Sequence, residues 1–95
     1  MNTIELTITK EDLLTALYSS NHDCPIARAL IRAGMKDVAC GGWDVTFKKP
    51  YFLGFGKTYR YIDVTELTNK IVPMMDVIFM KRQKEPETFT YTLKY

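Results

Sequence analysis

The sequence predicts a single α+β domain, a two-layer sandwich with a mainly antiparallel sheet and two or three helices on one face. Residues 3–9 and 89–95 alternate apolar and polar side chains, which is typical of half-buried strands. Between them lie helical segments and further strand-like runs. The 95 residues, of which 46% are hydrophobic and 25% charged, fit one globular domain spanning 1–95.

The first strand places Ile4, Leu6 and Ile8 on one face. Thr9 then caps a helix, because acidic residues occupy the following turn and one of them lies three positions after the threonine. Residues 19–21 are Ser-Ser-Asn, which end or bend this helix. The apolar face of the helix consists of residues at helical spacing, namely Leu13, Leu14, Leu17 and Tyr18.

A second helix begins at Asp23 or Cys24, since Asp23 can cap it and Pro25 suits the first turn. It ends at Gly34, which can adopt the left-handed conformation of a C-cap. We expect it to be buried on most sides, leaving a narrow polar strip. Its buried residues are Ile26, Ala27, Ala29, Leu30, Ile31 and Ala33.

A two-residue glycine turn or a glycine bulge at Gly41–Gly42 is the next expected feature. In a two-residue hairpin, Cys40 would pair with Trp43 and, further along, Val38 with Val45. All four side chains would then face the same side of the hairpin. We therefore expect the Cys40 thiol and the Trp43 indole side by side in a dry interior.

Residues 51–61 continue as an aromatic, strand-like run, with Gly54 and Gly56 marking a turn or bulge. The last strand alternates without interruption. Its inward side chains are Phe89, Tyr91, Leu93 and Tyr95.

Asp63 or Thr65 can cap a helix that Pro73 must kink or interrupt. The run 74–80 is too continuously apolar to assign by period, and we favour a helix there. Whether residues 63–82 form one kinked helix or two elements stays open.

Composition argues against several classes of protein. No apolar run approaches the ~20 residues that a membrane span needs, and the first residues lack the features of a secretory signal. Two cysteines without a signal indicate free thiols in a reducing cytoplasm. The net charge of +2 does not by itself imply a nucleic-acid binder, although residues 48–95 carry nine basic and five acidic side chains.

The run CPIARAL at 24–30, the later Gly41-Gly42-Trp43 and the terminal strand after Pro86 resemble a group of small uncharacterised proteins encoded by bacteriophages and prophages. Their helices carry the pattern C-P-[IV]-A-x-A-[LI]. The resemblance implies a phage-like source, hence the host cytoplasm, and no mechanism. Because no catalytic constellation stands out, we expect a non-enzymatic binding protein, a phage accessory factor acting on a host protein. A homodimer stays open.

Cys24 is the minority candidate for a catalytic residue, because a helix amino terminus lowers the pKa of a thiol. The alternative, which we favour, is that Cys24 caps or packs under the helix start. A metal site from His22, Cys24 and Cys40 lacks a fourth ligand, so we expect no metal and no cofactor. A disulfide between the two cysteines is disfavoured in a reducing cytosol.

Arg28 and Arg32, four residues apart, lie on one helical face, and Lys36 follows the helix. They can form a fork for phosphate or for partner carboxylates. The alternative, which we favour, is a solvated strip or pairing within the chain. The acids considered for that pairing are Asp37, Asp44 and Glu5.

The segment 48–61 interleaves basic and aromatic residues, as single-stranded nucleic-acid sites do. Binding of nucleic acid or a small anion here is the alternative function. The segment departs from the RNA-recognition signature, and alternate rings are expected to face the core. The candidate residues are Lys48, Lys49, Tyr51, Lys57, Tyr59 and Arg60.

Overall fold

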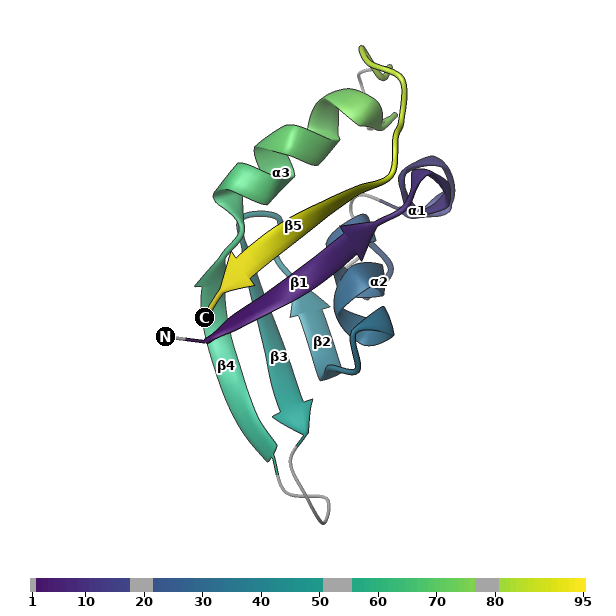
Figure 1. Ribbon diagram of the computed structural model, residues 1–95. Coiled ribbons are helices and arrows are strands. Elements are labelled where there is room, and N and C mark those ends of the chain that lie inside the picture. Colours follow the sequence, from purple (N-terminus) through teal and green to yellow (C-terminus); the bar gives the residue numbers. More distant parts are fainter. Residues whose placement is uncertain (1, 18–21, 51–55, 77–80) are drawn as a thin grey trace.

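The fold is a small α+β domain whose strands form two antiparallel sheets. A computed structural model describes residues 2–17, 22–50, 56–76 and 81–95 (Figure 1). Within these ranges lie three α-helices and five strands, and β1 and β5 cross in front of the other sheet (Figure 1). The α+β class with antiparallel strands is therefore confirmed, and the strands are divided between two sheets.

The first sheet joins the two ends of the chain. Strand β1 (Thr3–Ile8) pairs antiparallel with β5 (Phe89–Lys94), so that Leu6 faces Tyr91 and Ile8 faces Phe89. The apolar residues of both strands point inward and the threonines outward, as the alternation predicted.

The second sheet has the order β2 (Lys36–Cys40), β3 (Asp44–Pro50) and β4 (Gly56–Asp63). Its inward side chains include Val38, Cys40, Val45 and Phe47. Two register shifts interrupt the ladders, one on β2 and one on β4. Asp37 and Tyr61, one in each shifted segment, have positive φ angles of 50° and 56°.

The turn between β2 and β3 differs from the one expected. Cys40 pairs with Val45, and the Gly41 N–H donates to the Asp44 carbonyl at 2.8 Å, so the turn is Gly42–Trp43. Gly42 takes a φ of 90°, which a glycine adopts without strain. The predicted pairs of Cys40 with Trp43 and of Val38 with Val45 were both wrong, and Trp43 is 55% exposed.

Helix α1 (Lys10–Thr15) begins at the predicted cap. The Thr9 hydroxyl accepts from the Asp12 N–H, and the Asp12 carboxylate accepts from the Thr9 N–H, both at 3.0 Å. The helix ends earlier than expected, and both Leu14 and Leu17 are exposed. The predicted apolar face was therefore wrong at these two leucines, and Tyr18 lies outside the described residues.

Helix α2 (Pro25–Arg32) has Cys24 as its N-cap. It ends in a Schellman motif: the Gly34 N–H donates to the Ile31 carbonyl, and the Met35 N–H to the Leu30 carbonyl. Gly34 has a φ of 96°, as predicted for a left-handed C-cap. Ile31 is exposed, and Ala33 is too, so the expectation that both are buried was wrong.

Helix α3 (Thr65–Ile71) continues into a 3₁₀ turn, Val72–Met74, where Pro73 interrupts the α-helical geometry as expected. The Asp63 carboxylate accepts from the Thr65 N–H at 2.9 Å and from its hydroxyl. Within the run 74–80, Met74 ends the turn and residues 77–80 lie outside the described residues.

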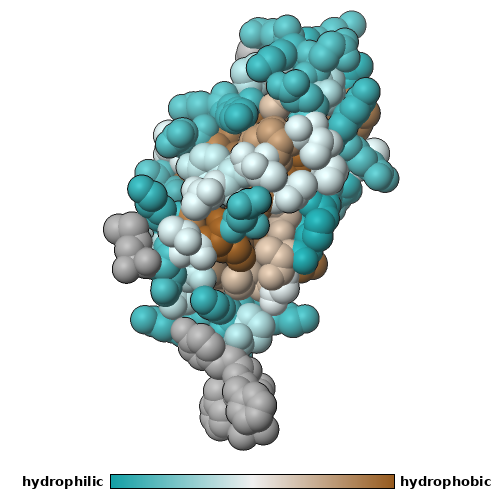
Figure 2. Space-filling model, viewed as in Figure 1, coloured by the Kyte–Doolittle hydropathy of each residue, from teal (hydrophilic) through white to brown (hydrophobic). Residues whose placement is uncertain are grey.

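One hydrophobic core lies between the sheets and the inner faces of α2 and α3. Its largest fully buried side chains are Phe47, Leu6, Ile8, Ile26, Leu30, Leu67, Ile71, Met74, Met75 and Leu93. On the face drawn in Figure 2, pale and hydrophobic residues lie near the middle and hydrophilic residues surround them. No helix in the described ranges is long and apolar enough to cross a membrane.

Candidate functional site

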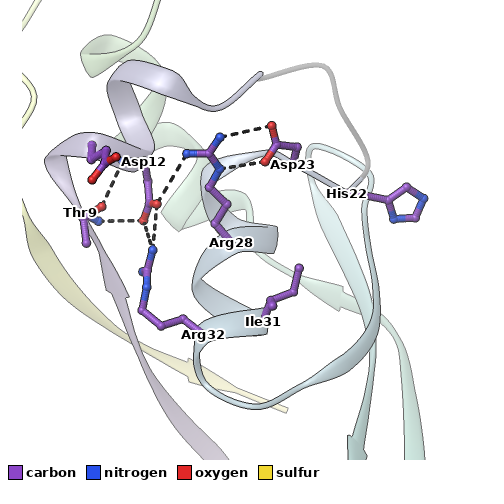
Figure 3. A pocket seen from close by; sticks show the side chains of 8 residues that line it. Thr9, Asp12, His22, Asp23, Arg28, Ile31 and Arg32 are labelled. Atoms are coloured by element: carbon purple, nitrogen blue, oxygen red, sulfur yellow. Dashed lines mark hydrogen bonds and ion pairs between the residues drawn. The ribbon is translucent and has the colours of Figure 1, made fainter.

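Two arginines of α2 converge on one buried aspartate of α1 (Figure 3). Arg32 Nη2 donates to both Asp12 carboxylate oxygens, at 2.8 and 3.0 Å. Arg32 Nη1 donates to the Thr7 carbonyl at 2.7 Å, while Arg28 Nη1 lies 4.0 Å from Asp12 Oδ1. Asp12 thus ties α1 to α2, and Arg32 ties α2 to β1.

Arg28 also forms a fork with Asp23, the residue before the N-cap. Its Nε and Nη2 donate to the two carboxylate oxygens of Asp23 at 2.8 and 3.2 Å, and its Nη1 donates to the Thr15 hydroxyl at 2.6 Å. The intrachain acids that pair with Arg28 and Arg32 are therefore Asp12 and Asp23, and pairing with Asp37, Asp44 or Glu5 was the wrong assignment.

These contacts favour the ionised form of both aspartates. Burial opposes the charge of Asp12, but hydrogen bonds from Arg32 and from Thr9 outweigh it and lower the pKa of Asp12 below 3.8. The hydrogen bonds from Arg28 lower the pKa of Asp23 and raise that of Arg28. The network therefore holds its charges at neutral pH and connects three elements.

A surface depression of about 550 Å³ lies over this network. Ile31 contributes an apolar wall, and His22 points away from the arginines (Figure 3). The remaining lining residues are Thr9, Glu11, Asp12, Asp23, Arg28 and Arg32. The sequence analysis grouped Lys36 with the two arginines. In the structure Lys36 begins β2, and it does not belong to the residues described as lining this depression.

The second group of predicted site residues lies on β3 and β4, and Tyr51 lies outside the described residues. The Tyr59 ring is stacked on Phe47 at 5.7 Å and meets Tyr95 edge-on at 4.6 Å. The Tyr59 ring thus packs against the core, as expected for alternate rings of this segment.

The basic residues of this second group also lie on β3 and β4. The Lys57 ammonium lies 5.1 Å from the Tyr59 ring centre, and that of Lys49 lies 5.5 Å from the ring of Tyr95. Lys48 is half-buried and Arg60 is exposed. The rings that these two lysines approach are therefore held by the core.

Trp43 is a functional candidate that the sequence interpretation missed, because it was assigned to the interior. Two hydrogen bonds fix the backbone of the turn that carries Trp43. The N–H of Val64, the residue before α3, donates to the Trp43 carbonyl at 2.9 Å. The buried Thr68 hydroxyl on α3 donates to the Gly42 carbonyl at 2.5 Å. A rigid turn therefore presents an exposed indole. Tyr61, which is 76% exposed, lies near the same end of the β3–β4 ladder.

Acidic residues surround the backbone of this turn. Asp44 follows Trp43, Asp63 pairs directly with Asp44 across the ladder, and Glu66 lies in the first turn of α3. None of the three forms an ion pair with a basic group in the described ranges. The Asp63 carboxylate accepts from the Thr65 N–H and hydroxyl, and these hydrogen bonds lower the pKa of Asp63.

The two cysteines form a buried pair. The Cys24 sulfur accepts from the Ala27 N–H at 3.3 Å as the cap of α2, so the expected structural role of Cys24 is present. Interaction with the Cys40 side chain and the backbone N–H groups of the helix start outweigh burial and lower the pKa of Cys24 to about 7. The same interaction, with burial, raises the pKa of Cys40.

No group of three or more potential ligands that could hold a metal ion occurs in the described part of the chain. Comparison of the chain with protein-family models, with curated proteins and with solved structures gave no match.

Proposed function

We propose that this chain is a non-enzymatic protein-binding module that uses Trp43 as the anchor of its interface. The observation that carries the proposal is an indole that is 55% exposed on a turn whose backbone is held at two carbonyls by α3. Tryptophan and tyrosine are enriched among the residues that dominate binding energy at protein interfaces. A turn that is already rigid loses little conformational entropy on binding.

The charges around the turn define the kind of partner. Asp44 follows Trp43 in the chain, Asp63 pairs with Asp44 across the ladder, and Glu66 lies in the first turn of the helix that holds the turn. The complementary surface is an apolar pocket for Trp43 with lysine or arginine side chains at its rim. The resemblance to phage proteins makes a protein of the host cell the partner to seek.

The experiment passes a nuclease-treated lysate of the host cells over three immobilised chains and identifies the proteins that each one binds. The three chains are the wild type, Trp43→Ala and Leu17→Ala. Leu17 is the matched control, because it is another exposed large apolar side chain and lies just after α1. The retained protein is then purified and titrated against each chain.

The proposal expects one protein held by the wild type and by Leu17→Ala but lost with Trp43→Ala. Its affinity should fall roughly 30-fold for Trp43→Ala, as for an anchor that contributes about 2 kcal/mol. Asp63→Asn should weaken binding less and reduce its salt dependence.

Three results would overturn the proposal. One is a protein that Trp43→Ala retains as well as the wild type does, and another is no retained protein at all. The third is binding only before nuclease treatment, with a steep loss of affinity on adding salt. That result would favour the alternative function, nucleic-acid binding through Lys48, Lys49, Lys57 and Arg60.

A further inference from the structure

The two-stranded sheet leaves the outer edge of β5 without a pairing strand in the described ranges. Asn2 and Tyr95 exchange both of their main-chain hydrogen bonds, at 3.0 and 2.9 Å, and pairs of this type alternate along an antiparallel ladder. The main-chain groups of Leu93 therefore point toward β1, while the N–H and C=O groups of Thr92 and Lys94 point away from it. No main-chain hydrogen bond from another described element reaches these outward groups.

The opposite edge of this sheet is already in contact with the rest of the fold. It belongs to β1, where the Thr7 carbonyl accepts from Arg32 Nη1 at 2.7 Å, and α2 lies beside that strand (Figure 1). On the β5 side, the Lys70 ammonium of α3 lies 4.3 Å from the centre of the Phe89 ring, which places a helix side chain over the start of β5. Access for a further strand is therefore along the second half of β5.

A surface groove of about 440 Å³ lies along this half of the strand. Its lining combines four consecutive residues of β5, from Tyr91 to Lys94, with Asp63 at the end of β4 and Glu66 in the first turn of α3. The charges of Glu66 and Asp63 add to burial in raising the pKa of Tyr91, so both carboxylates act on the interior of this groove. Lys94 is the one basic residue among the described lining residues, against two acids.

We propose that the outer edge of β5 binds an extended basic segment of a partner protein as a third strand of this sheet. The main-chain groups of Thr92 and Lys94 pair with that segment, as in other cases of strand addition. Every second side chain of the added strand lies on the groove side, where a lysine or arginine meets the carboxylates of Asp63 and Glu66. The inference goes beyond the binding proposed for Trp43, because it concerns a different surface and does not require the indole.

A second copy of this chain fits the edge less well than a basic segment does. In a symmetric antiparallel pair of β5 strands centred on Thr92, Lys94 of one copy would lie opposite Thr90 of the other. Thr90 does not belong to the described lining of the groove, so this arrangement brings no cation to Glu66. It would also need the start of β5, where Lys70 lies over the Phe89 ring.

The test titrates the isotope-labelled wild-type chain with a short capped peptide, Thr-Lys-Thr-Lys-Val-Lys-Thr, whose lysines share one face of a strand. The amide resonances of Thr92 and Lys94 should shift, and their amide protons should exchange rapidly in the free chain. With peptide at about ten times its Kd, this exchange should slow about tenfold, because only the unbound fraction of the chain exchanges. The same peptide with methylated backbone nitrogens keeps its charge but loses its N–H donors, so it should bind at least about tenfold more weakly.

Variants of the chain locate the charge that the peptide meets. Glu66→Gln should weaken peptide binding about two- to fivefold, as expected for the loss of one exposed ion pair. Glu5→Gln is the matched control and should leave the affinity unchanged, because Glu5 is exposed and pairs with Thr92 across the sheet but lies outside the described lining of the groove. Trp43→Ala should bind the peptide as the wild type does, so a failure of this proposal is distinguishable from a failure of the binding proposed for Trp43.

Several results would overturn the proposal. These are no shift at about 1 mM peptide, equal binding of the methylated peptide, and equal effects of the two glutamate variants. Protection of Thr92 that rises with the concentration of the chain alone would also overturn it, because a second copy would then occupy the edge.

Discussion

Asp12→Asn tests the charge network at its centre with a side chain of nearly unchanged shape. The two oxygens of Asp12 accept three close hydrogen bonds, two from Arg32 and one from the Thr9 N–H. An amide has only one oxygen, so its NH₂ group must face a donor of Arg32. We therefore expect at least one of these bonds to be lost, together with the negative charge.

The expected loss of stability follows from the geometry. Hydrogen bonds to charged groups contribute about 1.5–3 kcal/mol, and the partial exposure of Arg32 places this contribution toward the lower end. A loss of about 2 kcal/mol lowers the urea midpoint by roughly 1 M for a protein of this size. Urea unfolding followed by circular dichroism measures it.

Glu11→Gln is the matched control, since it neutralises an exposed acid in the same first turn. It should change the free energy of unfolding by less than about 0.5 kcal/mol. Equal effects of the two substitutions would refute the reasoning, because the network would then contribute no more than a surface charge.

Further predictions concern stability. The pKa of Asp12 is lowered in the folded state, so the ionised carboxylate stabilises the fold above about pH 4. The difference in the free energy of unfolding between wild type and Asp12→Asn should therefore shrink as acid protonates the folded carboxyl. A difference that stays constant with pH would contradict this. Gly34→Ala should lower stability by about 1–2 kcal/mol in thermal unfolding, since φ is 96° there. Tyr59→Ala should lower the free energy of unfolding by about 2–3 kcal/mol, because the ring packs on Phe47 and Tyr95. Tyr59→Phe should lower it by less than about 0.5 kcal/mol, because within the described residues the hydroxyl accepts a hydrogen bond from the exposed Asn2 alone. Similar losses for the two variants would place the ring outside the core.

The sequence was most informative where the signal is local. The alternation of 3–8 and 89–94 identified both strands of one sheet, and the Thr9 cap and the glycine at 34 located ends of the two first helices. Each of these features depends on residues within a few positions of one another, so tertiary packing had little to add.

The turn before β3 depended on tertiary contacts. Two-residue turns at Gly41–Gly42 and at Gly42–Trp43 are both compatible with the glycines. Moving the turn by one residue leaves the inward set of each strand unchanged, so Val38, Cys40, Val45 and Phe47 stayed inside as expected. Only Trp43 differs from the predicted burial: it is exposed because the turn lies at Gly42–Trp43, where hydrogen bonds from Val64 and Thr68 hold the two carbonyls.

The partners of the arginines were also beyond local patterns. Choosing Asp12 as the partner of Arg32 requires that α1 packs against α2, because twenty positions separate the two residues. The same holds for the cysteines, since sixteen positions separate them along the chain and both are buried in the same core.

Fluorescence of the single tryptophan tests the exposure on which the proposed interface depends. With Trp43 on the outside of the turn, its emission in the native chain should lie close to that of indole in water, and acrylamide should quench it strongly. Blue-shifted emission that resists acrylamide would place the indole in the interior opposite Cys40, and the proposed binding surface would not exist.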